Sequence, residues 1–130
     1  MATWQYPVLE QQVVLMKTLV GLILWLSVCP VYAVDCDAIE RLGSWKGYLI
    51  PSWQSGRKVV GMGKLALYSA PDRACRVAGE AIPAGSRLDA YVDYKGFTSI
   101  MYSDPEGELV TGWVVTRRLK PNGYGIGPKQ

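Results

Sequence analysis

The sequence predicts a small all-β barrel, and three observations lead to this prediction. Past residue 64, apolar and aromatic runs of five to nine residues alternate with turn residues, a spacing typical of β-sandwiches and barrels. No part of this region has the apolar spacing of a long amphipathic helix. The chain of 130 residues has room for one small domain, and its apolar content of 49% is ordinary for a globular protein.

Four strands are expected in this region, with turn residues between them. Lys95-Gly96 forms the tip of a tight hairpin, and further turns are predicted at IPAG and DPEGE. In the second strand, alternation assigns Leu88, Ala90 and Val92 to the inner face. The strands are expected at residues 64–70, 86–94, 97–103 and 109–116.

Before residue 64 the pattern is less regular. Residues 35–43 predict a short helical turn that Asp37 caps and Gly43 ends. Residues 44–63 predict one or two irregular strands. The expected divisions of the chain are an N-terminal extension at 34–63, a barrel at 64–120 and a flexible tail at 121–130, which is rich in Gly and Pro.

The first 33 residues have the layout of a secretory signal peptide. Lys17 precedes an uncharged apolar run from Thr18 to Val28, and Pro30 and Ala33 follow. A transmembrane anchor is the competing interpretation, but this run of eleven residues is shorter than the ~20 needed to span a bilayer. We therefore expect cleavage after Ala33 and a periplasmic or secreted protein with no stable membrane span.

Two details of the N-terminus leave alternatives open. The first fifteen residues carry Glu10 and no basic residue, so Met16 would make a better start for a signal peptide. Cys29 lies near the end of the apolar run, as it would in a lipoprotein. The residue before a lipidated cysteine is normally small, however, and Val28 is not.

Cysteine use agrees with export. Cleavage would leave Cys36 and Cys75, and in an oxidising compartment this pair predicts one disulfide. The bond would close a loop of about 40 residues and stabilise the fold by roughly 4 kcal/mol. Catalytic or metal-binding thiols are the alternative, but the chain has neither a CxxC spacing nor a histidine. The net charge of +3 indicates no strong preference for nucleic acid or anionic membranes.

From residue 64 to 120 the order of motifs resembles the bacterial SH3-like (SH3b) domain. The motifs are a short strand ending in LYSAPD, an IPAG turn, a KGF hairpin and a GWVV strand that runs into RRLK. The resemblance implies a partly open SH3-like barrel with a single 3₁₀ turn at Arg117-Arg118 before the last short strand. Phe97 stands where the family most often has tryptophan, and Tyr68 where an arginine is common, which leaves the ligand open.

The resemblance also gives structural roles to Gly112 and Trp113. Gly112 would allow a close backbone approach where its strand bends. Trp113 would close one end of the barrel under the 3₁₀ turn, since large aromatic residues in small domains usually supply core area. The alternative is that Trp113 belongs to a binding surface. Arg117 and Arg118 are expected to be solvated turn residues rather than an anion site.

The sequence predicts no enzyme, no cofactor and no metal site. Without histidine, the commonest general base and zinc ligand is missing. Acidic residues gather at 35–37, 89–93 and 104–108, in turns or on exposed strand faces where solvation is the simpler interpretation. No glycine-rich loop follows a strand and opens a helix, so nucleotide binding has no support.

A surplus of aromatic residues around the first turn and the central hairpin supplies the candidate binding residues. Tyr91 with Tyr68 or Tyr94 would line a shallow groove suited to an extended peptide. Cross-strand packing within the sheet is an equally good explanation. The full set of candidates is Tyr68, Tyr91, Tyr94, Phe97 and Tyr102.

Two functions from different classes follow. The resemblance implies a non-enzymatic, exported binding module that recognises cell-wall peptide or a protein partner in the cell envelope. The alternative is a periplasmic immunity or inhibitor protein that blocks a toxic or wall-degrading enzyme. The alternative gains weight because no catalytic domain accompanies the predicted barrel, and because the extension at 34–63 offers additional interface.

Overall fold

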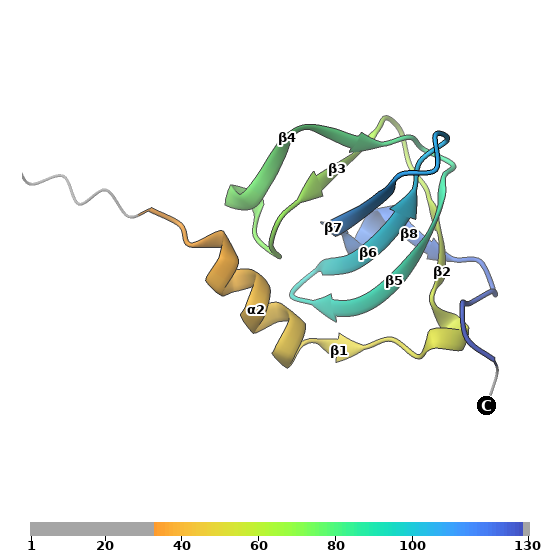
Figure 1. The fold of residues 1–130 in the computed structure, drawn as a ribbon, viewed down its shortest axis with the longest axis horizontal. Coiled ribbons are helices and arrows are strands. Elements are labelled where there is room, and N and C mark those ends of the chain that lie inside the picture. Colours follow the sequence, from red (N-terminus) through yellow and green to blue (C-terminus); the bar gives the residue numbers. More distant parts are fainter. Residues whose placement is uncertain (1–32, 129–130) are drawn as a thin grey trace, which may run out of the picture. The chain divides into compact units, whose positions relative to one another are not determined.

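A computed structural model describes residues 33–128, and their strands form one curled antiparallel sheet (Figure 1). The strand order is β4-β3-β7-β6-β5-β2-β8, and β1 pairs with β5. The prediction of an all-β, partly open barrel is therefore confirmed. The strands are β1 (Tyr48–Leu49), β2 (Gly56–Val59), β3 (Leu65–Tyr68), β4 (Arg76–Ile82), β5 (Arg87–Tyr94), β6 (Phe97–Ser103), β7 (Leu109–Val115) and β8 (Leu119–Pro121).

Residues 1–32 and 129–130 lie outside the described part, and so do the predicted signal-peptide features from Met16 to Pro30. Within residues 33–128, no helix is both long enough and apolar enough to cross a membrane. Of the described residues, 34–128 belong to one compact unit of the chain.

One α-helix, α2 (Cys36–Lys46), precedes the sheet. It begins after Asp35, whose carboxylate accepts a hydrogen bond from the Ala38 amide at 3.1 Å. The predictions that Asp37 caps the helix and that Gly43 ends it are both wrong. Gly43 is buried inside the helix, which continues to Lys46. A glycine is present there because the helix packs closely on the sheet, not because the helix stops.

Strands β5, β6 and β7 match three of the expected strands, and Lys95 and Gly96 form the turn between β5 and β6. Their φ angles are +46° and +82°, as a two-residue hairpin turn with positive φ at both positions requires. Strand β4 was not predicted. Five of its seven residues are exposed, so its sequence lacks the apolar alternation that identifies a half-buried strand. Three 3₁₀ turns complete the fold: η2 (Ser52–Gln54), η3 (Arg73–Cys75) and η4 (Thr116–Arg118).

The sheet has a hydrophobic cluster on each face. Neighbouring residues in one strand point to opposite faces, and Trp113 and Val114 belong to different clusters. The first cluster fills the inside of the curl and consists of Ile50, Val59, Leu65, Leu67, Ile82, Leu88, Ala90, Ile100, Tyr102 and Val114. The second, on the outer face, consists of Tyr68, Val92, Phe97 and Trp113.

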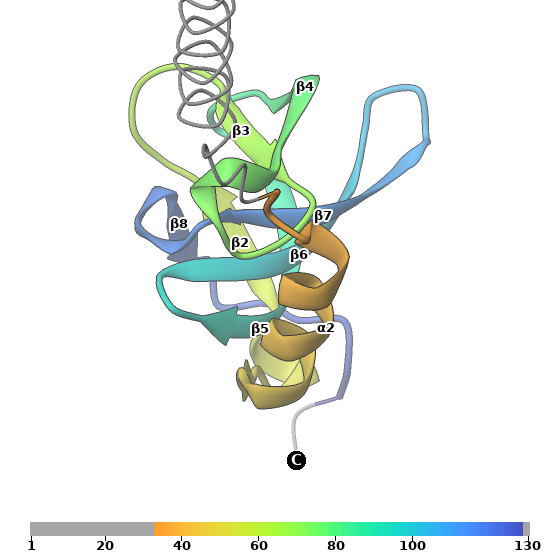
Figure 2. The ribbon, with the colours of Figure 1, turned by 90° about the vertical axis from the view of Figure 1, so that its left-hand side faces the viewer.

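Helix α2 lies against the second cluster. Figures 1 and 2 show the helix running beside β5. A Cβ atom placed on Gly43 would lie 2.7 Å from Cγ of Pro71 and 3.3 Å from ring atoms of Trp113 and Tyr94. The predicted disulfide between Cys36 and Cys75 is confirmed, with 5.8 Å between the Cα atoms. It ties the first residue of the helix to η3, so the helix is fixed at its start by a covalent bond and further along by close packing.

The sheet begins earlier in the chain than the predicted barrel at 64–120. Strand β2 lies between β5 and β8, and β1 pairs with β5. Both fall within residues 34–63, which we expected to form an extension outside the barrel. They belong to the sheet because Ile50 and Val59 are buried in the first cluster.

Candidate functional site

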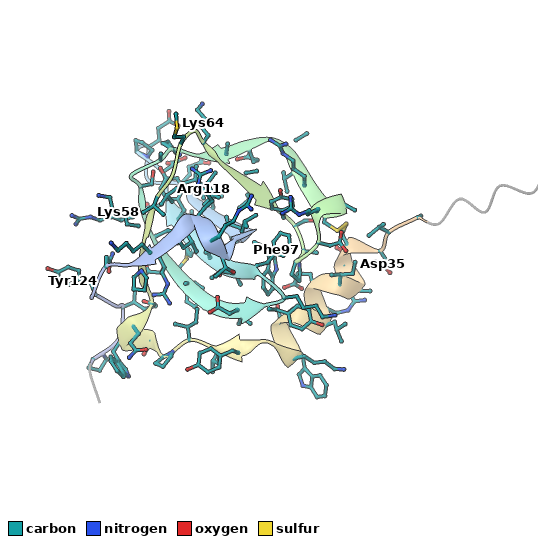
Figure 3. All side chains as sticks on the ribbon, turned by 180° about the vertical axis from the view of Figure 1, so that it is seen from behind. Asp35, Lys58, Lys64, Phe97, Arg118 and Tyr124 are labelled. Atoms are coloured by element: carbon teal, nitrogen blue, oxygen red, sulfur yellow. A yellow bond between two sulfur atoms is a disulfide. The ribbon has the colours of Figure 1, made fainter. Side chains whose placement is uncertain are left out.

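Three of the predicted ligand-binding aromatics are buried. Tyr68, Phe97 and Tyr102 are each only 8% exposed. The rings of Tyr68 and Phe97 meet edge to face, with 5.2 Å between centroids and an interplanar angle of 79°, which is a favourable geometry for packing. Figure 3 shows Phe97 within the body of the molecule. These side chains form part of the core and present little surface to a ligand.

The other two candidates, Tyr91 and Tyr94, are half-buried against the second cluster. Burial, and next the charge of Asp89, raise the pKa of the Tyr91 hydroxyl above its ordinary value. The Lys95 ammonium lies 5.3 Å from the centre of the Tyr94 ring. Tyr102 belongs to the first cluster, on the other face of the sheet. The five predicted residues therefore do not come together as one groove.

A bulge in β5 explains why Leu88, Ala90 and Val92 do not share one face, as strict alternation along the strand predicted. The pairing of β5 with β6 shifts by one residue between Ala90 and Val92, and a shift of one residue moves the following side chains to the opposite face. Leu88 and Ala90 lie in the first cluster, whereas Val92 lies in the second. All three are buried as predicted, but not on one face.

Trp113 is 2% exposed and belongs to the second cluster. Its ring lies close to Gly43 of helix α2, so it packs under this helix. A Cβ atom on Gly112 would lie 2.8 Å from Cδ1 of Leu67 and 2.9 Å from the Tyr68 carbonyl oxygen. Gly112 therefore permits the close approach of β3 to β7.

A recess lies between η2 and the C-terminal segment, away from the predicted aromatics. Its volume is about 410 Å³, within the ~300–1,000 Å³ typical of small-ligand sites. Two aromatic side chains, Trp53 and Tyr124, line it together with the guanidinium of Arg57. Tyr124 is 74% exposed, and Figure 3 shows it at the edge of the molecule. The remaining lining residues are Gln54, Pro121, Gly123 and Gly127.

A second recess of about 200 Å³ also has Tyr124 in its wall. It lies over the ends of β5 and β6 and contains Arg87, Asp89 and Met101. Because Tyr124 lines both recesses, they are neighbours along one surface. We call the two recesses together the Tyr124 groove.

The segment after β8 is held in place by backbone hydrogen bonds, although residues 121–130 were expected to form a flexible tail. Pro121 itself belongs to β8. The Gly56 amide donates to the Tyr124 carbonyl at 2.8 Å, and the Ile126 amide donates to Oγ of Ser55 at 3.1 Å. A Cβ atom on Gly125 would lie 2.3 Å from the carbonyl carbon of Trp53. The glycines that suggested flexibility therefore allow this segment to lie directly on η2.

One arginine lines each recess of the Tyr124 groove, Arg57 the larger one and Arg87, beside Asp89, the smaller one. The Arg57 guanidinium donates to the carbonyls of Gln54 and Gly56 at 2.5 and 3.0 Å, which fixes it at the wall of the larger recess. Beside it, Lys58 pairs across the strands with Arg87 on one side and Lys120 on the other. Like charges directly opposite one another destabilise a sheet. The same arrangement creates a local positive potential that attracts anions.

The sequence does not reveal the Tyr124 groove, because its two aromatic walls, Trp53 and Tyr124, are 71 residues apart in the chain. Trp53 lies in an irregular segment, and Tyr124 lies in a stretch that composition marks as disordered. The alternation of glycine with aromatic and aliphatic residues in NGYGIG is the one signal that was present, because such glycines permit a close backbone approach.

No family model, curated protein or solved structure was found to match this chain. The resemblance to bacterial SH3-like domains therefore rests on its sequence motifs alone. In the part of the chain that the structure describes, no group of three or more metal-ligating side chains is close enough to hold an ion.

Proposed function

We propose that this protein is a non-enzymatic, exported binding module that recognises a peptide of the cell envelope through the Tyr124 groove. The observation that carries the proposal is the pair of adjoining recesses on either side of Tyr124, with Trp53 and Arg57 in the larger one. Exposed aromatic side chains offer apolar area together with a polar group, and an arginine binds a carboxylate well.

The shape of the groove supports an extended ligand. Two recesses along one surface accept two successive groups of a chain, whereas a single closed cavity would favour a compact molecule. Arg57 lines the larger recess, which has no acidic residue in its lining, so this recess favours a carboxylate of the ligand. In the smaller recess Arg87 lies beside Asp89, and the two charges offset each other. Cell-wall peptide fits this chemistry.

The roles of the acidic residues support a binding function over a catalytic one. Asp104 accepts hydrogen bonds from the amides of Glu106 and Glu108 at 2.9 and 2.8 Å, so it shapes a turn. Asp93 accepts from the Thr98 hydroxyl at 2.6 Å, and Asp89 accepts from the Ser55 hydroxyl at 3.0 Å. Together with the absence of histidine from the sequence, these structural roles leave no obvious general base.

The Cys36–Cys75 disulfide supports export, because such bonds persist in oxidising compartments. It agrees with the predicted signal peptide and with a periplasmic or secreted location.

The test is co-sedimentation of the exported protein with isolated cell-wall sacculi. We expect saturable binding that Tyr124→Ala weakens by at least ~10-fold, as for an exposed aromatic at the centre of a binding site. Tyr48→Ala is the matched control, because Tyr48 is a similarly exposed tyrosine, at 67%, that lines neither recess. Absence of binding, or equal loss in both variants, would contradict the proposal.

The row of cations at Arg87, Lys58 and Lys120 favours a second candidate, an immunity or inhibitor protein that docks on an acidic enzyme surface. Such an interface extends beyond the recesses and depends on charge. Under this function the protein would not sediment with sacculi. Lys58→Glu would abolish its inhibition of an envelope hydrolase or toxin, while Tyr124→Ala would have the smaller effect.

A further inference from the structure

Helix α2 carries an apolar strip on the side that faces away from the sheet. Ala38, Leu42 and Trp45 are four and three residues apart and so share one face of the helix. All three are exposed, Leu42 by 42% and Trp45 by 82%. The buried residue Gly43 holds the other face against the sheet. An apolar strip of this kind on the solvent side of a helix marks an interaction surface.

We propose that this strip binds the same strip of a second copy of the protein, with the two helices antiparallel. A two-fold axis at the middle of the strip, near Leu42, would bring the two Leu42 side chains together. An interface related by a two-fold axis must be complementary to itself, and the strip meets this condition in both size and charge.

The complementarity in size comes from Ala38 and Trp45. Each lies about one helical turn from the proposed axis, on opposite sides of it. In the antiparallel pair, the smallest side chain of each strip therefore lies beside the largest side chain of the other. The Trp45 indole of one copy would lie over Ala38 of the second copy, where no larger side chain obstructs it.

The complementarity in charge comes from Asp35 and Lys46, at the two ends of the helix and on one flank of the strip. The antiparallel arrangement brings Asp35 of each copy near Lys46 of the other, and opposite charges at such a position set the orientation of a helix pair. On the other flank, the two-fold axis would bring the two Arg41 side chains near each other. Asp37 stands four residues before Arg41 in each helix, and its negative charge offsets their repulsion.

The size of the strip predicts a weak dimer. A buried tryptophan contributes ~150–250 Å², so two tryptophans and the four smaller side chains give an interface below the ~1,200–2,000 Å² of stable complexes. We therefore expect a dissociation constant on the order of micromolar or weaker, and a monomer–dimer equilibrium that depends on concentration.

The test is sedimentation velocity over a range of concentrations, on protein produced from the full sequence and purified after export. Wild-type protein should shift from monomer to dimer as its concentration rises. Trp45→Ala should raise the dissociation constant by at least ~10-fold, since a buried tryptophan usually dominates a small interface. Met62→Ala is the control, because Met62 is 96% exposed but lies outside α2.

A size swap tests the antiparallel arrangement itself. Ala38→Trp alone should weaken the dimer, because each introduced ring would meet Trp45 of the second copy. The double variant with Ala38→Trp and Trp45→Ala restores one large and one small side chain at each contact, and it should dimerise again. Either a wild-type protein that stays monomeric up to ~1 mM, the weakest affinity that the test covers, or a dimer that Trp45→Ala leaves unchanged would overturn the proposal.

Discussion

Gly43 lies in close contact with the residues that the helix covers. Its backbone lies so near Pro71, Trp113 and Tyr94 that an added Cβ atom would approach the proline ring to 2.7 Å. Close contact of this kind leaves no space for a side chain at position 43. The same residue misled the sequence prediction, because glycine is also the usual signal for the end of a helix.

Gly43→Ala should therefore destabilise the protein, although alanine favours a helix by ~1 kcal/mol over glycine. The methyl group must displace Pro71 or the helix, and overpacking of this kind typically costs ~1–3 kcal/mol. Urea unfolding should show a lower midpoint. Ser44→Ala, on the exposed neighbour, should change the free energy of unfolding by no more than ~0.5 kcal/mol. A Gly43→Ala protein more stable than wild type would contradict the proposed packing.

Tyr91 makes stability sensitive to alkaline pH. Its folded pKa is raised above the ordinary value of 10.0, mainly by burial. Between pH 10.0 and the raised pKa, the folded state keeps a proton that the unfolded state has lost, so this contribution to stability is complete below pH 10.0 and falls as pH rises. Urea unfolding from about pH 8 to pH 11 should show a smaller alkaline loss in Tyr91→Phe than in wild type. Equal losses in both proteins would argue against the buried hydroxyl.

The disulfide and helix α2 act together as one element. The bond joins the first residue of the helix to η3, and the helix covers the second cluster. Replacing both cysteines with serine should lower the free energy of unfolding by about 4 kcal/mol, the loop-closure value for ~40 residues. Chemical unfolding of oxidised and reduced wild-type protein should show the same difference. An unchanged midpoint on reduction would show that helix packing alone holds this element.

Elements whose sequences carry local signals were predicted well. Strands β5 to β7 show alternation, and their hairpin turn needs only Lys95-Gly96. The elements that were missed depend on distant contacts. Strand β4 has little buried surface of its own, and the segment after β8 is ordered by hydrogen bonds to residues about 70 positions earlier. No local pattern records such a contact.

At the scale of the whole molecule, the sequence predicted the barrel but not the candidate site. The aromatic pattern pointed to Tyr68 and Phe97, which form part of the core. Within β5, one bulge moves Val92 to the face opposite Ala90. The Tyr124 groove instead joins η2, β2 and the C-terminal segment. The groove forms because the curled sheet brings these distant segments together, and the strand order that does so cannot be deduced from any one segment of the sequence.

The three tryptophans of the described part lie in three different environments. Trp53 lines the groove, Trp45 lies on the exposed face of α2, and Trp113 is buried between helix and sheet. Their indole N–H groups give separate NMR signals, which Trp→Phe variants assign. One spectrum therefore reports on ligand binding in the groove, on self-association through α2 and on the packing of the core.

The most direct measurement is the change in these indole signals when soluble cell-wall peptide is added to the purified protein at constant protein concentration. We expect a saturable shift of the Trp53 signal and no shift of Trp113 or Trp45, with the Trp53 shift much reduced in Tyr124→Ala. A Trp53 signal that stays fixed at saturating peptide, or a shift that Tyr124→Ala leaves unchanged, would contradict the claim that the Tyr124 groove binds envelope peptide.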